Sequence, residues 1–208
     1  MPLTPSQFNL VQSLKRGTCC ICHCVNSDLR RYFDTLIYEN INDSGTRATI
    51  LRSRGFCREH TRDLQRMGDA LGQSILYSDL IGQLIGYLSQ RESNSSDKCP
   101  ACTKTDELTK WYITGLVDGL RNESFMDAYT HSGALLCLPH FSSVIKSCTS
   151  YRTAKTIVDL QRESMCELKN ELDEFIRKSD YRFSGEPFGR ERDAWIRAAH
   201  FLVGRWMS

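Results

Sequence analysis

The chain has 208 residues, of which 40% are hydrophobic and 25% charged, and its formal net charge is +2. This length supports one large or two small folded domains, and the composition is ordinary for a soluble globular protein. The net charge is too small to indicate a nucleic-acid or membrane surface. No apolar run approaches the ~18–20 residues that span a bilayer, and the first residues lack a secretory signal. We therefore expect a cytoplasmic protein with reduced thiols and no membrane partner.

Apolar residues spaced three and four apart predict an all-α fold. Two segments, 19–24 and 99–102, are expected as thiol-rich knuckles that precede a helix, and the polar segment 92–98 is expected as a linker. The last helix is expected to pack on the preceding repeat. In chain order, the predicted helices cover residues 4–15, 28–41, 46–54, 69–90, 105–121, 123–131, 153–178 and 189–203. Two further helices are expected to start near residues 57 and 137.

Two cysteine motifs, each present twice, organise the sequence. Every position of the first copy maps onto the second by adding 80, and helix-face residues such as Tyr32 and Tyr112 follow the same offset. We therefore predict a tandem duplication, with metal-binding helical repeats at 1–92 and 93–178 and a C-terminal loop and packing helix at 179–208. The motif residues are Cys19 and Cys22, Cys57 and His60, Cys99 and Cys102, and Cys137 and His140.

Three thiolates and one imidazole form a ligand set for a tetrahedral soft-metal site. A Cys-x-x-Cys turn directs both sulfurs at one point, and a Cys-x-x-His pair at a helix start places both ligands on one face. The positive end of the helix also stabilises a thiolate. The Cys-x-x-Cys of one repeat can meet the Cys-x-x-His of the same repeat or of the other, and the sequence leaves both pairings open.

Two Zn²⁺ ions are the expected cofactors, because four protein ligands with no open position are typical of a structural zinc site. Two iron–sulfur clusters are the alternative, since clusters also use mainly thiolates and sometimes histidine. That alternative would make the chain a redox or electron-transfer protein, and labile thiolates would suit metal trafficking. Zinc is preferred because nothing in the sequence marks an electron-transfer partner.

Four further cysteines have no counterpart at the offset of 80 and are interpreted as packing or incidental thiols. Two of them, Cys20 and Cys24, are close enough in sequence to substitute as ligands. The haem-attachment pattern Cys-x-x-Cys-His ends at His23, but Thr103 replaces it in the second copy, so haem is not expected. No paired carboxylates, nucleophile–base pair or phosphate loop indicates catalysis, and we predict no catalytic residues. The four cysteines are Cys20, Cys24, Cys148 and Cys166.

The expected function is therefore that of a non-enzymatic scaffold that binds a protein partner. The long helices also permit a homodimer. A nucleic-acid-binding zinc module is a less favoured alternative, because a basic cluster near the first site has no equivalent in the second copy. That cluster contains Arg52, Arg54, Arg58, Arg62 and Arg66.

The twin cysteine motifs occur together with a characteristic C-terminal segment, residues 171–183 (ELDEFIRKSDYRF), and with Asp193-Ala194-Trp195. This combination resembles a family of functionally uncharacterised bacterial and archaeal proteins. The resemblance implies a prokaryotic cytoplasmic protein and the same eight ligands, and it supplies no activity. The chain departs from the pattern before Cys137, where Leu135-Leu136 replaces the Gly-Phe that precedes Cys57.

Overall fold

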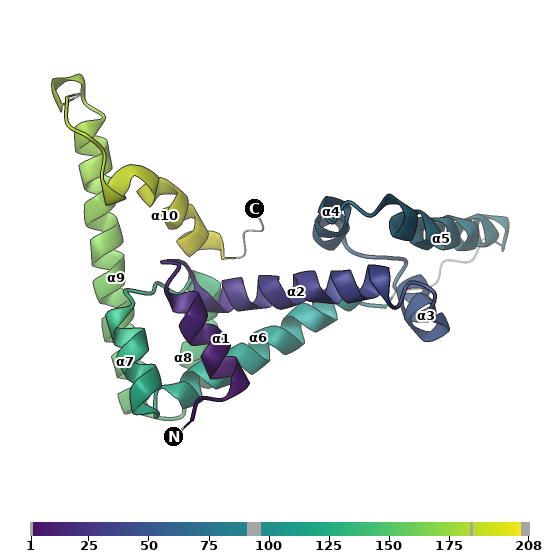
Figure 1. Ribbon diagram of the computed structural model, residues 1–208, viewed down its shortest axis with the longest axis horizontal. Coiled ribbons are helices and arrows are strands. Elements are labelled where there is room, and N and C mark those ends of the chain that lie inside the picture. Colours follow the sequence, from purple (N-terminus) through teal and green to yellow (C-terminus); the bar gives the residue numbers. More distant parts are fainter. Residues whose placement is uncertain (1, 91–96, 184, 205–208) are drawn as a thin grey trace. The chain divides into compact units, whose positions relative to one another are not determined.

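The computed structural model describes residues 2–90, 97–183 and 185–204. Within these residues the chain forms ten α-helices, two short 3₁₀ helices and no strand, which confirms the predicted all-α fold (Figure 1). None of the described helices combines the length and apolar character required to cross a membrane. The elements are α1 (Pro5–Leu14), α2 (Cys20–Tyr38), α3 (Ser44–Arg52), α4 (Arg58–Arg66), α5 (Ala70–Gln90), α6 (Pro100–Gly119), α7 (Glu123–His131), α8 (Leu138–Ser147), α9 (Tyr151–Lys178), η1 (Tyr181–Phe183), η2 (Arg190–Asp193) and α10 (Ala194–Val203).

The two Cys-x-x-Cys motifs span the starts of helices rather than forming separate knuckles: Cys19 and Cys99 directly precede α2 and α6. The predicted helix starts near residues 28 and 105 are therefore wrong, since α2 begins at Cys20 and α6 at Pro100. Proline at the first helical position is pre-organised for a helix start. Thr105, at the predicted start of the second of these helices, instead donates its hydroxyl to the Ala101 carbonyl at 2.7 Å within α6. The two ligand thiols of each motif consequently lie on either side of the start of its helix.

The two Cys-x-x-His motifs open helices as predicted. Cys57 is the N-cap residue of α4 and Cys137 that of α8, so the histidine three residues on lies in the first turn of each. The final helix is shorter than expected, because a 3₁₀ turn over Arg190–Asp193 precedes α10. Residues 92–96 of the predicted linker lie outside the described residues.

The helix order α2–α3–α4–α5 recurs as α6–α7–α8–α9. The starts of α2 and α6, Cys20 and Pro100, are 80 residues apart, as are the starts of α4 and α8, Arg58 and Leu138. This correspondence supports the predicted tandem duplication, which stays a prediction together with the domain division at 1–92, 93–178 and 179–208.

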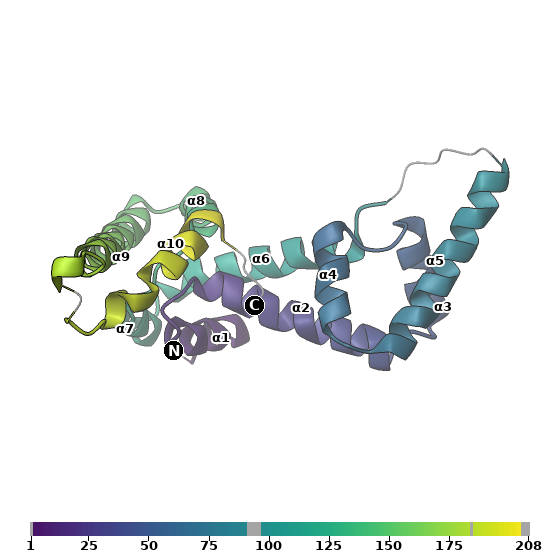
Figure 2. The same cartoon turned by 90° about the horizontal axis from the view of Figure 1, so that it is seen from above.

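Contacts divide the chain into two compact units: Met1–Asn26 with Thr109–Ser208, and Ser27–Leu108. In the first unit α10 packs on α9 (Figure 1), and α1 packs against α7. In the second unit α5 lies beside α3 (Figure 2). The core of the second unit consists of Leu29, Phe33, Leu36, Ile37, Ile41, Ile50, Leu64, Leu76, Leu80 and Ala101.

Candidate metal centres

The eight predicted ligand residues gather into two groups of four, and each group takes its halves from different motif copies. Within a group, all four ligand atoms lie within 4.8 Å of one another. The Cys-x-x-Cys of each copy therefore meets the Cys-x-x-His of the other copy, which was one of the two pairings left open by the sequence. Cluster 1 is Cys19, Cys22, Cys137 and His140, and cluster 2 is Cys57, His60, Cys99 and Cys102.

In cluster 1, the Nδ1 atom of His140 faces all three sulfurs. It lies 3.2 Å from the Sγ atoms of Cys22 and Cys137 and 3.4 Å from that of Cys19. The Cys22 and Cys137 sulfurs are 3.6 Å apart. Cys19 and Cys137 are buried, whereas Cys22 and His140 are half-buried. The four side chains thus converge on one point beneath the surface of the first unit.

A buried glutamine holds the segment that leads into Cys137. Gln161, 2% exposed, donates its side-chain amide to the Leu136 carbonyl at 2.7 Å and accepts the Leu136 N–H at 3.1 Å. The backbone at the C-cap of α10 passes close to the same sulfur, since a Cβ on Gly204 would lie 3.2 Å from Cys137 Sγ. Gly204 also has a φ of +81°, so glycine is favoured there for both reasons.

Cluster 2 has the same arrangement in the second unit. His60 Nδ1 lies 3.2 Å from Cys57 Sγ, 3.4 Å from Cys102 Sγ and 3.6 Å from Cys99 Sγ. The other ring nitrogen, Nε2, lies 3.4 Å from Thr105 Oγ1, whose hydroxyl donates to the Ala101 carbonyl. Thr105 therefore accepts from the Nε2–H and fixes the tautomer that leaves Nδ1 free as a ligand.

The thiols of each cluster perturb one another's pKa. Burial acts to raise the pKa of Cys19, but contacts with Cys137, Cys22 and His140 outweigh it and lower that pKa well below its ordinary value. Burial and the neighbouring Cys57 and Cys99 raise the pKa of Cys102 to about 12. Contacts with Cys137 and Cys19 raise the pKa of Cys22, whereas the burial of Cys57 is outweighed by hydrogen bonds, chiefly from the backbone N–H of His60, which lower its pKa. In each cluster one thiol therefore ionises readily and a second resists, because two negative sulfurs would adjoin. A bound cation removes that conflict.

The donor set and its spacing fit a single tetrahedral ion. Zn–S bonds of ~2.3 Å at tetrahedral angles place two ligand sulfurs about 3.8 Å apart. The sulfurs of Cys22 and Cys137 are 3.6 Å apart in cluster 1, and those of Cys57 and Cys102 are 3.7 Å apart in cluster 2. The remaining four cysteines belong to neither cluster; Cys20 and Cys24 are buried in the first unit, where the Cys24 sulfur lies 3.0 Å from Ser13 Oγ.

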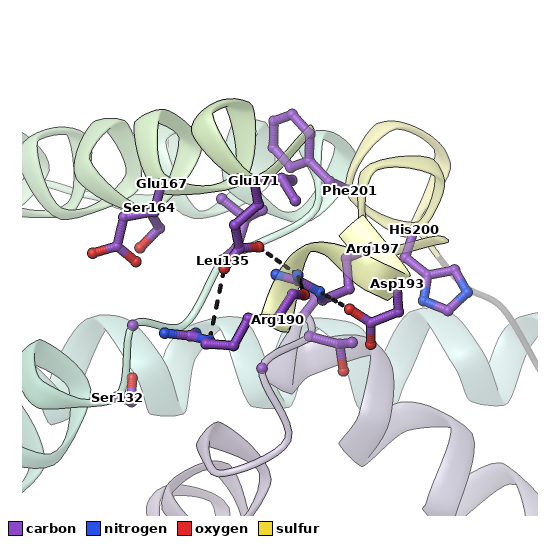
Figure 3. A pocket seen from close by; sticks show the side chains of 15 residues that line it. Ser132, Leu135, Ser164, Glu167, Glu171, Arg190, Asp193, Arg197, His200 and Phe201 are labelled. Atoms are coloured by element: carbon purple, nitrogen blue, oxygen red, sulfur yellow. Dashed lines mark hydrogen bonds and ion pairs between the residues drawn. The ribbon is translucent and has the colours of Figure 1, made fainter. Parts of the chain in front are cut away.

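A cavity of about 260 Å³ adjoins cluster 1 at Cys19, between α9 and the η2–α10 segment (Figure 3). Four of its ionic side chains are paired with one another: Arg197 donates to Glu171 and, at 2.8 Å, to Asp193. Arg190 lies 3.7 Å from Glu171. These ion pairs tie α10 to α9. The sequence marked Asp193-Ala194-Trp195 only through the family resemblance and Gly204 only as the glycine that ends the last helix, and no sequence signal marked Gln161.

Fold and donor set together define an all-α protein with two Cys₃His groups at metal-ligand spacing. The chain belongs to DUF6062, a family of unknown function whose model matches residues 78–208. It is also 26% identical over 203 residues to a protein of Caldicellulosiruptor sp. (strain Rt8B.4) named "Uncharacterized 23.9 kDa protein in xynA 3'region", covering 94% of this chain and 99% of that protein. No solved structure matches the chain. The resemblance to an uncharacterised family is thus confirmed.

Proposed function

We propose that this chain is a non-enzymatic protein in which two structural zinc ions, one in each cluster, brace a helical scaffold that binds a protein partner. The observation that carries the proposal is the convergence of four ligand atoms within 4.8 Å in each cluster. Three thiolates and one imidazole fill a tetrahedral site and leave no position for a substrate, which is the pattern of a structural rather than a catalytic site.

The same spacing disfavours the iron–sulfur alternative. A cluster with several irons stands between its ligands and holds the sulfurs on different irons further apart than one ion does. The short distances between Cys22 and Cys137 and between Cys57 and Cys102 instead suit donors on one ion. All ten cysteines are free of disulfides, which supports the expected reducing, cytoplasmic compartment.

The nucleic-acid alternative has little support from the basic cluster near the first motif. Arg52 lies 3.3 Å from Asp97, and the Arg54 guanidinium lies over the Tyr87 ring at 5.6 Å. These two side chains already have partners within the second unit, whereas a phosphate-binding surface needs several free cations on one face. A protein partner remains the better proposal.

Metal content per chain, measured with the visible spectrum on protein purified without oxygen, tests the proposal. We expect two zinc per chain and no colour. Cys57→Ser should remove one equivalent and lower stability, because structural zinc contributes directly to folding. Cys166→Ser, which changes an exposed thiol outside both clusters, is the control and should keep both ions. Iron with acid-labile sulfide, or full zinc content in Cys57→Ser, would contradict the proposal.

A further inference from the structure

The second half of α5 exposes large apolar side chains that the second unit does not cover. Ile81 is 58% exposed, Leu84 44%, Ile85 59% and Leu88 82%. In both views this part of α5 extends past α3 and α4, the two short helices of its unit (Figures 1 and 2). A helix that is apolar on its outer side normally has a partner there. We call these four residues the α5 apolar face.

The face is free of charge. Among the 21 residues of α5, the only charged side chain is Asp79, and it forms an ion pair with Arg47 of α3. Beside the face, Gly82 and Gly86 have nothing within 4 Å of where a Cβ would stand, so the helix backbone is open to close approach. Nothing on this face therefore attracts a charged ligand, and its partner must itself be apolar.

The spacing of the face specifies the kind of partner. Residues 81, 84, 85 and 88 follow the three-and-four spacing with which one helix packs along another. Charged residues beside such an apolar face normally select a different partner helix or fix the direction in which it packs. Residues 80–90 contain no charged residue. A second α5 supplies the required partner, since it is a helix with the same uncharged seam.

We infer that a second copy of this chain covers the α5 apolar face, with α5 packed antiparallel to its counterpart about a two-fold axis. A two-fold contact buries the same surface on both chains, so each copy covers the α5 apolar face of the other and the pair is closed. The axis passes near the middle of the seam, so Ile81 faces Leu88 of the other copy and Leu84 faces Ile85. This inference rests on the proposed function, because it identifies the partner that the zinc-braced scaffold binds.

The test is the solution mass of the full metal-loaded chain, measured by light scattering over a wide dilution range. We expect the mass of two chains for the wild type and of one chain for Ile85→Glu. Ile176→Glu, the same change at an exposed isoleucine of α9, is the matched control and should stay dimeric. A monomeric wild type, or a dimer that Ile85→Glu leaves intact, overturns the inference; so does a wild type that is monomeric but binds lipid vesicles.

A charge pair tests the antiparallel register. Ile81→Glu and Leu88→Lys should each be monomeric alone, and their mixture should recover the mass of two chains, because the introduced carboxylate of one chain would then meet the introduced ammonium of the other. A mixture that stays monomeric contradicts this register. Zinc content, measured in parallel, should remain at two per chain in every variant. Loss of the dimer with zinc intact therefore tests the interface alone, and loss of zinc in the wild type overturns the proposed function instead.

Discussion

The Sγ atom of Cys22 lies 3.6 Å from that of Cys137, although 115 residues separate them in the sequence. Cys57 and Cys102 are likewise 3.7 Å apart across 45 residues. One ion in each cluster would close these long loops, as a disulfide does, and restrict the unfolded chain. The crossed pairing thus makes each proposed ion a link between the two motif copies.

Double substitutions distinguish the crossed pairing from two self-contained repeats. Cys22→Ser with Cys137→Ser removes ligands from cluster 1 alone, so we expect one metal ion per chain to remain. Cys22→Ser with Cys57→Ser damages both clusters, so we expect none after dialysis against a weak chelator. Self-contained repeats would give the opposite results. Elemental analysis of the two dialysed proteins decides between them.

The ligand residues and most helices were predictable from the sequence, and the pairing was not. The local geometry of each motif, Cys-x-x-Cys and Cys-x-x-His, is enough to identify its residues as a pair of ligands. Helix periodicity located elements such as α7. The two copies are chemically equivalent, however, so either Cys-x-x-Cys satisfies either Cys-x-x-His. The choice depends on which helices pack together, which is a long-range property. The starts of α2 and α6 were mispredicted because Ser27 and Thr105 carry capping side chains that here lie within helices.

Thr105→Val should weaken metal binding at cluster 2 and leave cluster 1 unchanged. Valine keeps the shape of threonine but cannot accept the His60 Nε2–H, so the imidazole loses its orientation; such changes typically cost ~10–100-fold in affinity. Competition with a chromophoric chelator measures the loss. Thr103→Val, an exposed change in the same helix, is the control and should bind as the wild type does. Equal affinities of the two variants would argue against this role.

Gln161→Leu should destabilise the first unit and weaken cluster 1. The leucine leaves the Leu136 N–H and carbonyl buried without partners, and each such group costs ~1–3 kcal/mol. It also frees the segment that positions Cys137. Urea unfolding and chelator competition should both report the change. Gln12→Leu, on the exposed side of α1, should affect neither measurement. A Gln161→Leu protein with unchanged metal affinity would show that the hydrogen bonds between Gln161 and Leu136 are not needed to position Cys137.

Glu191→Gln should lower stability at neutral pH, and the difference from the wild type should shrink in acid. Lys178, 2.7 Å away, and the Gly189 N–H, 2.8 Å away, lower the pKa of Glu191 to about 2. An unfolded glutamate has a pKa of ~4.3, so between these values the unfolded chain binds more protons than the folded one. The stabilisation is therefore complete above ~4.3 and is lost as pH falls towards 2.

Urea midpoints of wild type and Glu191→Gln, measured side by side from neutral pH downwards, check this prediction. Both proteins release metal alike as their ligands become protonated, so the difference between the midpoints isolates the carboxylate. We expect a constant difference down to about pH 5 and a steady decrease below it. Glu163→Gln, at an exposed position of α9 without an ion pair among the described residues, should show no such pH-dependent difference. A difference between the two urea midpoints that stays constant into acid would mean that Glu191→Gln acts through altered packing rather than through the lost charge.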